Sequence, residues 1–328
     1  MIKRLLIENF KSIKHLELEC GRVNVLIGEP NTGKSNILEA LGLFSFMAFR
    51  GRFQDYVRMR EPHELFHNYV VREPIRITLD EHVIVGRFDE QRETVSFSEE
   101  GSTSPIMTID KSGIRLGGLY PSISASVRFY RFKPNVVFRS SDRPFLLPPD
   151  GSNLPSVLLF NPSLRSLVTS ILEGFSQKPI IDPRKSFFGV AWELEGLLQV
   201  LPYELISDTL KRLIFYLAAV ESNEGAVIAM EEPEAHAFPA YTKFLAERIA
   251  LDEGNQYFIT THNPYLLLSL VEKTPKENLA VFVTYLKGYE TGAVRLSDED
   301  LDKLVNLASA VFFNLDLFLK RLAEAPGP

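Results

Sequence analysis

The chain has 328 residues, of which 45% are hydrophobic and 24% charged, which is ordinary for one or two globular domains. Its formal net charge of −6 excludes a general attraction to phosphate polymers, so nucleic-acid binding would need a local basic patch. The single cysteine, Cys20, excludes an intrachain disulfide. With no signal-peptide pattern and no apolar run long enough to span a bilayer, we expect a cytoplasmic protein without membrane contact.

The first predicted elements surround a glycine-rich loop. Residues 2–10 and 13–20 alternate weakly between apolar and polar side chains, which predicts two short strands. Residues 22–28, RVNVLIG, are apolar and rich in valine up to a glycine, which predicts a strand buried on both faces of a parallel sheet. Apolar residues then recur at helical spacing from Ile37 to Ala48. The loop therefore joins a buried strand to a helix.

Residues 28–35, GEPNTGKS, match the pattern G-x-x-x-x-G-K-[ST] of a P-loop. Glycine allows the backbone to turn sharply and approach a phosphate, which then faces successive N–H groups and a helix N-terminus. Lys34 would reach the β- and γ-phosphates of ATP, and the Ser35 hydroxyl would hold Mg²⁺. The alternative is a glycine-rich turn that ends in Lys-Ser by chance. It is disfavoured because the sequence has the buried strand before the loop and the helix after it that a P-loop requires. The predicted nucleotide-binding residues are Gly28, Glu29, Pro30, Asn31, Thr32, Gly33, Lys34, Ser35 and Asn36.

The middle of the chain is dominated by predicted strands. Alternating runs within residues 75–132 are separated by Gly, Ser, Asp and Glu clusters, which predicts an antiparallel β layer. Residues 144–155 contain four prolines and are expected to form an ordered loop or a series of turns. Short helices are predicted over 162–177 and 191–200, so we expect a helical subdomain over 150–205. No heptad pattern persists, which excludes a long coiled-coil arm.

After residue 205 the pattern becomes one of strands alternating with helices. The predicted helices are 208–220, 240–251 and 264–271, and the predicted strands are 226–230, 256–261 and 279–286. This order predicts parallel βαβ units. We therefore expect one α/β domain over 1–328, with a mainly parallel sheet flanked by helices, an antiparallel β layer and a small helical insertion.

Polar residues follow two of these strands. Glu231 and Glu232 end the strand AVIAM, and we assign Glu231 to the metal and Glu232 to the attacking water. The alternative is an acidic cluster favoured by a helix dipole. His262 follows the strand QYFITT at the edge where α/β sheets bind ligands, so it is placed to contact the γ-phosphate or the water. The alternative is a structural histidine. Asn263 suits the cap of the next helix.

The helix over 208–220 begins at Ser207 or Asp208, both of which are good N-cap residues. An exposed helix N-terminus with a serine also suits phosphate binding. The two roles are compatible, and we include Ser207 among the candidate nucleotide-binding residues.

Together these motifs resemble the ATP-binding-cassette (ABC) ATPases of the SMC-like branch, and more closely the ATPase domain of the OLD-type (overcoming lysogenization defect) AAA proteins. The resemblance extends in order over most of the chain, through residues 7–41 and the segments DGSNLPSVL, LISDTLKRL, MEEPEAHAFP and TTHNPYLL. It implies an ABC-type head that binds and hydrolyses ATP with Mg²⁺. It also implies that two copies of the head form a homodimer around two nucleotides.

The resemblance extends to individual residues. Ser207 matches the signature serine, which in such ATPases binds the γ-phosphate of nucleotide held by the partner subunit. His262 matches the switch histidine, and Asn31 sits where the family has its P-loop asparagine. Lys11 and Ser12 match a position that contacts nucleotide in related ATPases, the alternative being a solvated strand end.

Departures from the family pattern predict slow or conditional hydrolysis. Glu231 stands where the wider ABC group has aspartate, which adds a methylene to the metal's reach. Thr209 stands where the signature usually has glycine, and its larger side chain would weaken the contact with the partner. No glutamine can be placed in the Q-loop, because Gln54, Gln177 and Gln199 all lack supporting context.

The alternatives concern what the ATPase acts on. OLD nucleases carry an additional acidic Toprim domain, but the acidic cluster LSDEDLDKL after His262 is typical of an exposed helix start, so we expect no intrinsic nuclease activity. The alternative function is a nucleotide-gated clamp on DNA or a partner protein, with little hydrolysis. A GTPase is disfavoured because no NKxD-like motif follows the P-loop. Candidate partners are DNA and an effector protein.

Overall fold

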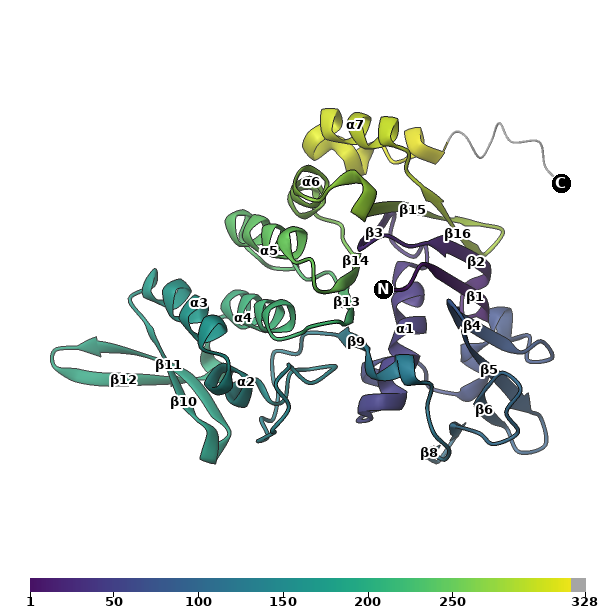
Figure 1. Ribbon diagram of the computed structural model, residues 1–328, viewed down its shortest axis with the longest axis horizontal. Coiled ribbons are helices and arrows are strands. Elements are labelled where there is room, and N and C mark those ends of the chain that lie inside the picture. Colours follow the sequence, from purple (N-terminus) through teal and green to yellow (C-terminus); the bar gives the residue numbers. More distant parts are fainter. Residues whose placement is uncertain (320–328) are drawn as a thin grey trace.

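Three β-sheets organise residues 1–319, the part of the chain that the computed structural model describes (Figure 1). The central sheet has the strand order β16-β15-β3-β14-β13-β9, and its strands run parallel except for β16. Its strands are β3 (Val23–Gly28), β9 (Val127–Tyr130), β13 (Val227–Glu231), β14 (Gln256–Thr260), β15 (Leu279–Lys287) and β16 (Glu290–Arg295). The expectation of an α/β fold with a mainly parallel sheet is confirmed.

Strand β3 is buried along its whole length because both faces of the central sheet are covered. Val23, Val25 and Ile27 belong to the hydrophobic core on one face, whereas Leu26 belongs to the core on the other. Successive side chains of a strand point to opposite faces, so a continuous apolar run suits a strand that is covered on both sides.

Helices cover the first face of the central sheet. Figure 1 shows α4, α5 and α6 arranged side by side along it, with α7 beyond them. Helices α4, α5 and α6 are the predicted helices, each displaced by one or two residues at one end. No helix within residues 1–319 has the length and apolar character needed to cross a membrane. The bounds are α4 (Asp208–Glu221), α5 (Pro239–Leu251), α6 (Pro264–Lys273) and α7 (Asp298–Leu307).

The second face is covered by α1 (Lys34–Phe49), which lies between the central sheet and an antiparallel sheet. Because both sheets contact it, α1 is buried on all sides from Ile37 to Met47. The antiparallel sheet has the order β2-β1-β4-β5-β6-β7-β8. Its strands are β1 (Arg4–Phe10), β2 (Ile13–Glu19), β4 (Ile75–Leu79), β5 (His82–Asp89), β6 (Thr94–Glu99), β7 (Met107–Asp110) and β8 (Gly113–Leu116).

The predicted β layer over 75–132 is correct for β4 to β8 but wrong at its end. Strand β9 leaves this layer and pairs in parallel with β13 in the central sheet. Phe129 packs toward α1, and its neighbour Tyr130 packs toward the helices on the opposite face. An alternating pattern identifies a strand but not the sheet that the strand joins.

The insertion over 150–205 is only half helical. It contains α2 (Leu154–Phe160) and α3 (Pro162–Glu173), followed by a three-stranded antiparallel sheet of β10 (Lys178–Asp182), β11 (Phe187–Leu194) and β12 (Leu197–Pro202). The predicted helix over 191–200 is therefore wrong. Leu194 pairs with Leu197, so Glu195 and Gly196 form a two-residue turn with φ values of 52° and 79°. Positive φ at both positions is what a tight hairpin requires.

Candidate functional site

The P-loop between β3 and α1 packs against the β15–β16 hairpin. Gly33 has a φ of 91°, which favours glycine. A Cβ atom at Gly33 would lie 2.0 Å from Oγ1 of Thr291, and one at Gly28 would lie 2.3 Å from Oγ1 of Thr284. Backbone conformation and crowding together require glycine at the two positions that the motif specifies.

Lys34 occupies the inside of this loop. Its Nζ donates to the backbone carbonyls of Gly28 at 2.9 Å and Glu29 at 2.7 Å. Burial lowers the pKa of Lys34 to about 8, although the charges of Glu232 and Glu29 oppose this shift. The ammonium group therefore stays charged at neutral pH, but burial penalises its charge, so it gains from any additional negative charge.

A cavity of about 360 Å³ opens beside the loop and brings most of the predicted site together. Its walls come from the β1–β2 turn, the P-loop, the start of α1 and the ends of β13 and β14. The first N–H groups of α1 have no partner within the helix, so this end attracts anions. The lining residues are Ser12, Pro30, Asn31, Thr32, Gly33, Lys34, Ser35, Asn36, Arg58, Glu232, Thr260 and His262.

Glu232 and His262 meet at this cavity, with Oε1 and Nε2 separated by 3.6 Å. The backbone N–H of Glu232 donates to the carbonyl of Thr260 at 3.1 Å, which ties the ends of β13 and β14 together. Burial lowers the pKa of His262, the charge of Lys34 lowers it further, and Glu232 opposes both. The lowered pKa favours the neutral imidazole, which can donate a hydrogen bond from one nitrogen and accept at the other.

Glu231, the last residue of β13, lies beside the start of α1. Burial raises the pKa of its carboxyl, but Arg131, a hydrogen bond with Ser35 and Arg58 together lower it below the usual value. The carboxylate therefore stays ionised next to the Ser35 hydroxyl. Two such oxygen donors fit Mg²⁺, which usually takes one or two protein ligands and completes its shell with phosphate and water.

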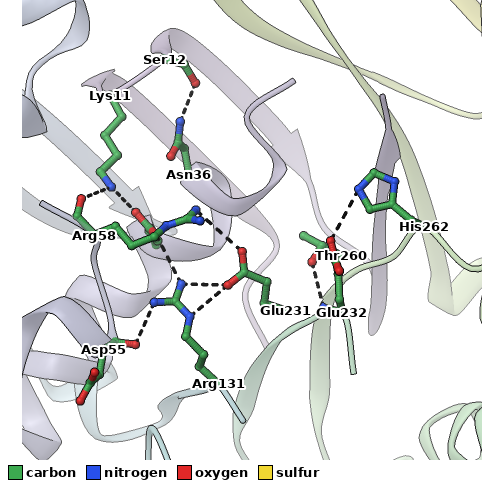
Figure 2. Close-up of polar contacts among 11 residues, drawn as sticks. Lys11, Ser12, Asn36, Asp55, Arg58, Arg131, Glu231, Glu232, Thr260 and His262 are labelled. Carbon is green, nitrogen blue, oxygen red and sulfur yellow. Dashed lines mark hydrogen bonds and ion pairs between the residues drawn. The ribbon is translucent and has the colours of Figure 1, made fainter. Parts of the chain in front are cut away.

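A buried ionic network next to Glu231 had no clear sequence signal. Glu39 of α1 is fully buried, and it contacts Nζ of Lys11, Nε of Arg58 at 2.5 Å and Nη2 of Arg131 at 3.4 Å. Arg58 lies in a segment without a predicted element, and Arg131 follows the strand that was assigned to the wrong sheet. Only the fold brings these residues together, and Figure 2 shows Lys11, Arg58 and Arg131 converging next to Glu231.

Of the two candidates in the β1–β2 turn, only Ser12 lines the cavity. Its hydroxyl lies 2.6 Å from Oγ1 of Thr291 and accepts from Nδ2 of Asn36 at 2.7 Å. Lys11 turns instead toward Glu39 and donates to the backbone carbonyl of Arg58 at 2.6 Å, as Figure 2 shows. The structure therefore does not bring Lys11 to the cavity.

Ser207 caps α4, as predicted, by accepting a hydrogen bond from the N–H of Leu210 at 3.4 Å. It is exposed and lies outside the P-loop cavity of its own chain, beside a separate and largely apolar cavity of about 560 Å³. Thr209, where the family usually has glycine, donates to the carbonyl of His236 at 2.9 Å. This threonine thus links α4 to the segment after Glu232.

None of the three Q-loop candidates lines the P-loop cavity. Gln177 lines the apolar cavity beside Ser207, and Gln54 lines a shallow pocket with Arg58. Gln199 is exposed on β12. Strand β9 is followed by Arg131, not by a glutamine, and it is Arg131 that contacts Glu231.

Two protein-family models match consecutive parts of the chain. Residues 1–126 match the family described as AAA ATPase domain. Residues 128–269 match the family described as AAA domain, putative AbiEii toxin, Type IV TA system. The first match contains the P-loop, and the second contains Glu231, Glu232 and His262. The chain is therefore an ATPase, and both halves of its candidate site fall within ATPase-type domains.

Solved structures share the fold at low sequence identity. An SMC head bound to the C-winged helix domain of ScpA is 16% identical with a TM-score of 0.54, and the match covers 91% of this chain and 98% of that one. An SMC head domain with an extended coiled coil, bound to the C-terminal domain of ScpA derived from Pyrococcus furiosus, is 13% identical with a TM-score of 0.50; coverage is 93% and 98%. These likenesses show that the chain has the fold of an SMC head domain.

A short stretch also matches an uncharacterized protein of Methanocaldococcus jannaschii. The two are 49% identical over 45 residues, which is 13% of this chain and 20% of the length of that protein.

Proposed function

We propose that this ATPase is of the OLD type, that it uses Mg²⁺, and that two copies pair around two ATP molecules and separate after hydrolysis. The observation that carries the proposal is the cavity in which the P-loop, Glu232 and His262 meet. It combines an anion-binding helix terminus, a buried lysine and a carboxylate–imidazole pair. Phosphoryl transfer to water needs such positioning and charge stabilisation rather than covalent chemistry.

The triphosphate of ATP would lie against the P-loop amides and the start of α1. Lys34 would exchange the carbonyls of Gly28 and Glu29 for phosphate oxygens and so neutralise charge on the β- and γ-phosphates. Ser12 and Asn36, which are hydrogen-bonded to each other, would form the wall on the other side.

Ser35 and Glu231 would hold Mg²⁺, which when bound supplies charge neutralisation at the phosphates. Glu232 orients the attacking water and accepts its proton. The neutral imidazole of His262 donates a hydrogen bond to the γ-phosphate. Since their facing atoms are 3.6 Å apart, the two side chains can act on one reacting centre.

Ser207 supports pairing of two copies because it is exposed at a helix N-terminus and lies away from its own P-loop cavity. In a pair, this terminus would bind the γ-phosphate of nucleotide held by the other copy. The partner that the pair acts on would be an effector protein or DNA. A protein is the first choice, because the matched SMC heads were solved bound to ScpA and the net charge of this chain is −6.

The second candidate function is a nucleotide-gated clamp with little hydrolysis. The observation that favours it is the contact of Arg58 and Arg131 with Glu231. Their guanidinium groups already engage the carboxylate that would bind the metal. Steady-state phosphate release with and without DNA distinguishes the two. A pair that forms with ATP yet releases no phosphate under either condition favours the clamp.

Calorimetric titration of Mg·ATP tests the proposal. We expect wild type to bind and Lys34→Ala to lose at least about tenfold in affinity, because the phosphate charge loses its buried cation. Lys276→Ala is the matched control, since Lys276 makes an exposed ion pair with Asp302 at 2.9 Å. Light scattering of the same samples should show a dimer only with nucleotide. Absence of binding heat in folded wild type would overturn the proposal.

A further inference from the structure

Glu231 is already neutralised by a cation that belongs to the chain. Nε and Nη2 of Arg131 lie 3.0 Å and 2.9 Å from the same oxygen, Oε2, of Glu231. Figure 2 shows the guanidinium directed at this carboxylate. The other oxygen, Oε1, lies 3.8 Å from Nη2 of Arg58. The carboxylate that would bind the metal therefore faces two guanidinium groups.

Arg131 is held in this position from several sides. Its backbone N–H donates to the carbonyl of Pro149 at 2.9 Å, and Nη1 donates to the carbonyl of Asp55 at 3.1 Å. The guanidinium carbon lies 5.0 Å from the centre of the Phe129 ring, and the side chain is 20% exposed. This is a fixed, largely buried ion pair rather than a mobile surface contact, so its charge acts strongly on neighbours.

A divalent cation held by Ser35 and Glu231 would share the carboxylate with Arg131. Like charges repel strongly where water screens them poorly, so the guanidinium opposes a bare metal ion at this position. The phosphates of ATP would add negative charge to the adjacent P-loop cavity, which Ser35 lines, and reverse that balance.

We propose that Arg131 makes metal binding at Glu231 conditional on nucleotide. The guanidinium occupies Oε2 and balances the carboxylate until ATP supplies the charge that holds Mg²⁺ beside Ser35. This inference depends on the proposed role of Ser35 and Glu231 as metal ligands. Arg131 is a positioning residue in this scheme, because it acts on the metal through Glu231.

Binding of Mn²⁺, followed by electron paramagnetic resonance, tests the inference without measuring turnover. Wild type should bind Mn²⁺ weakly alone and tightly with a non-hydrolysable ATP analogue. Arg131→Gln should bind Mn²⁺ without nucleotide roughly tenfold more tightly than wild type, because the guanidinium no longer repels the metal ion. The double variant Arg131→Gln with Glu231→Gln should lose that gain.

The matched control is Arg128→Gln, in the strand β9 that precedes Arg131. Arg128 bonds Asn223 and lies 3.6 Å from the ring centre of Phe145, away from Glu231, so its removal should leave Mn²⁺ affinity unchanged. Arg131→Lys keeps one charge but cannot place two donors on one oxygen, so it should bind Mn²⁺ with intermediate affinity. This second variant provides the test if Arg131→Gln does not fold.

The outcomes separate the inference from the function on which it depends. If folded Arg131→Gln and Arg131→Lys bind Mn²⁺ no better than wild type, Arg131 is only a structural brace and the inference is wrong. If wild type binds no Mn²⁺ even with nucleotide, the assignment of Ser35 and Glu231 as metal ligands fails.

Discussion

Nε2 of His262 lies 3.6 Å from Oε1 of Glu232, and both side chains face the cavity that Lys34 also lines. The three groups form one electrostatic unit. Lys34 lowers the pKa of His262, while Glu232 raises the pKa values of both His262 and Lys34 against the stronger effect of burial. A change in the charge of any one of these groups therefore changes the electrostatic environment of the other two.

Glu232→Gln should keep ATP binding and slow phosphate release by about a hundredfold or more, the usual contribution of a general base. The amide has nearly the same shape as the carboxylate but cannot accept the proton of the water. Because hydrolysis would separate the pair, light scattering should show a dimer that persists with ATP. Glu290→Gln, which alters an exposed ion pair with Lys14, is the control. Unchanged turnover in Glu232→Gln would remove this residue from the mechanism.

ATP affinity should weaken as pH rises above about 8, the lowered pKa of Lys34. Below this pH the lysine is already charged. Above it, binding of phosphate must return a proton to the lysine, which costs up to roughly tenfold in affinity per pH unit until the raised pKa of the complex is reached. Calorimetry at pH 8.5 to 9 in buffers of different ionisation enthalpy should report proton uptake. Equal affinity and no proton uptake across this range would contradict the assignment.

Glu234 should make folding stability fall as pH rises from about 4.5 to 7. Burial raises the pKa of its carboxyl to about 7; Oε1 accepts from Oγ1 of Thr261 at 2.5 Å, and Oε2 has no partner within residues 1–319. In this pH window the folded chain retains a proton that the unfolded chain releases. The stability of Glu234→Gln relative to wild type should therefore rise by on the order of 3 kcal/mol from pH 4.5 to 8.

Urea unfolding across this pH range measures the effect of Glu234. The exposed residue Glu253 supplies the control, because Glu253→Gln should not change the pH dependence. Parallel stability curves for wild type and Glu234→Gln would show that Glu234 titrates at its ordinary pKa.

Ser207→Arg and Lys34→Ala should each abolish phosphate release, and a mixture of the two should partly restore it. In a mixed pair, one site combines an intact P-loop from one copy with an intact Ser207 from the other. If pairing is random and symmetric, an equal mixture recovers about a quarter of wild-type activity. No recovery, although mixed pairs form, would show that Ser207 does not complete the site of the other copy.

The control for Ser207 is a second helix cap. Ser297 caps α7 as Ser207 caps α4, and each loss of a cap costs on the order of 1 kcal/mol of stability. Ser297→Arg should lower the melting temperature in the same way and leave phosphate release unchanged.

Much of the fold and the nucleotide loop could be predicted because the signals involve residues close in the chain. Gly33 needs its left-handed backbone, and Asn263 accepts from the N–H groups of Tyr265 and Leu266, as its position before Pro264 indicates. Continuous apolar runs likewise identified β3, β13 and β14, and helical spacing identified the helices that follow them. Each of these features depends on contacts within a few residues or on burial of the element itself.

The errors arose where the same pattern allows two structures. Leu194, Leu197, Leu198 and Leu201 have the spacing of one face of a helix, yet Gly196 sits in a tight turn and the leucines lie on two strands. In these strands Leu194, Leu197 and Leu198 remain more than half exposed, so their spacing does not mark the buried face of a helix. The pairing of β11 with β12 took precedence over the spacing.

The sequence by itself determined the P-loop, the acidic strand end at Glu231 and Glu232, and the helix caps, because these follow from local backbone preferences. Only the tertiary structure decided that β9 joins the central sheet and that Arg131, 100 residues before Glu231, reaches its carboxylate. The sequence alone does not indicate which charged side chain will form an ion pair with which other. Its partner is set by which strand ends meet at the edge of a sheet, and by how poorly water screens the charge there.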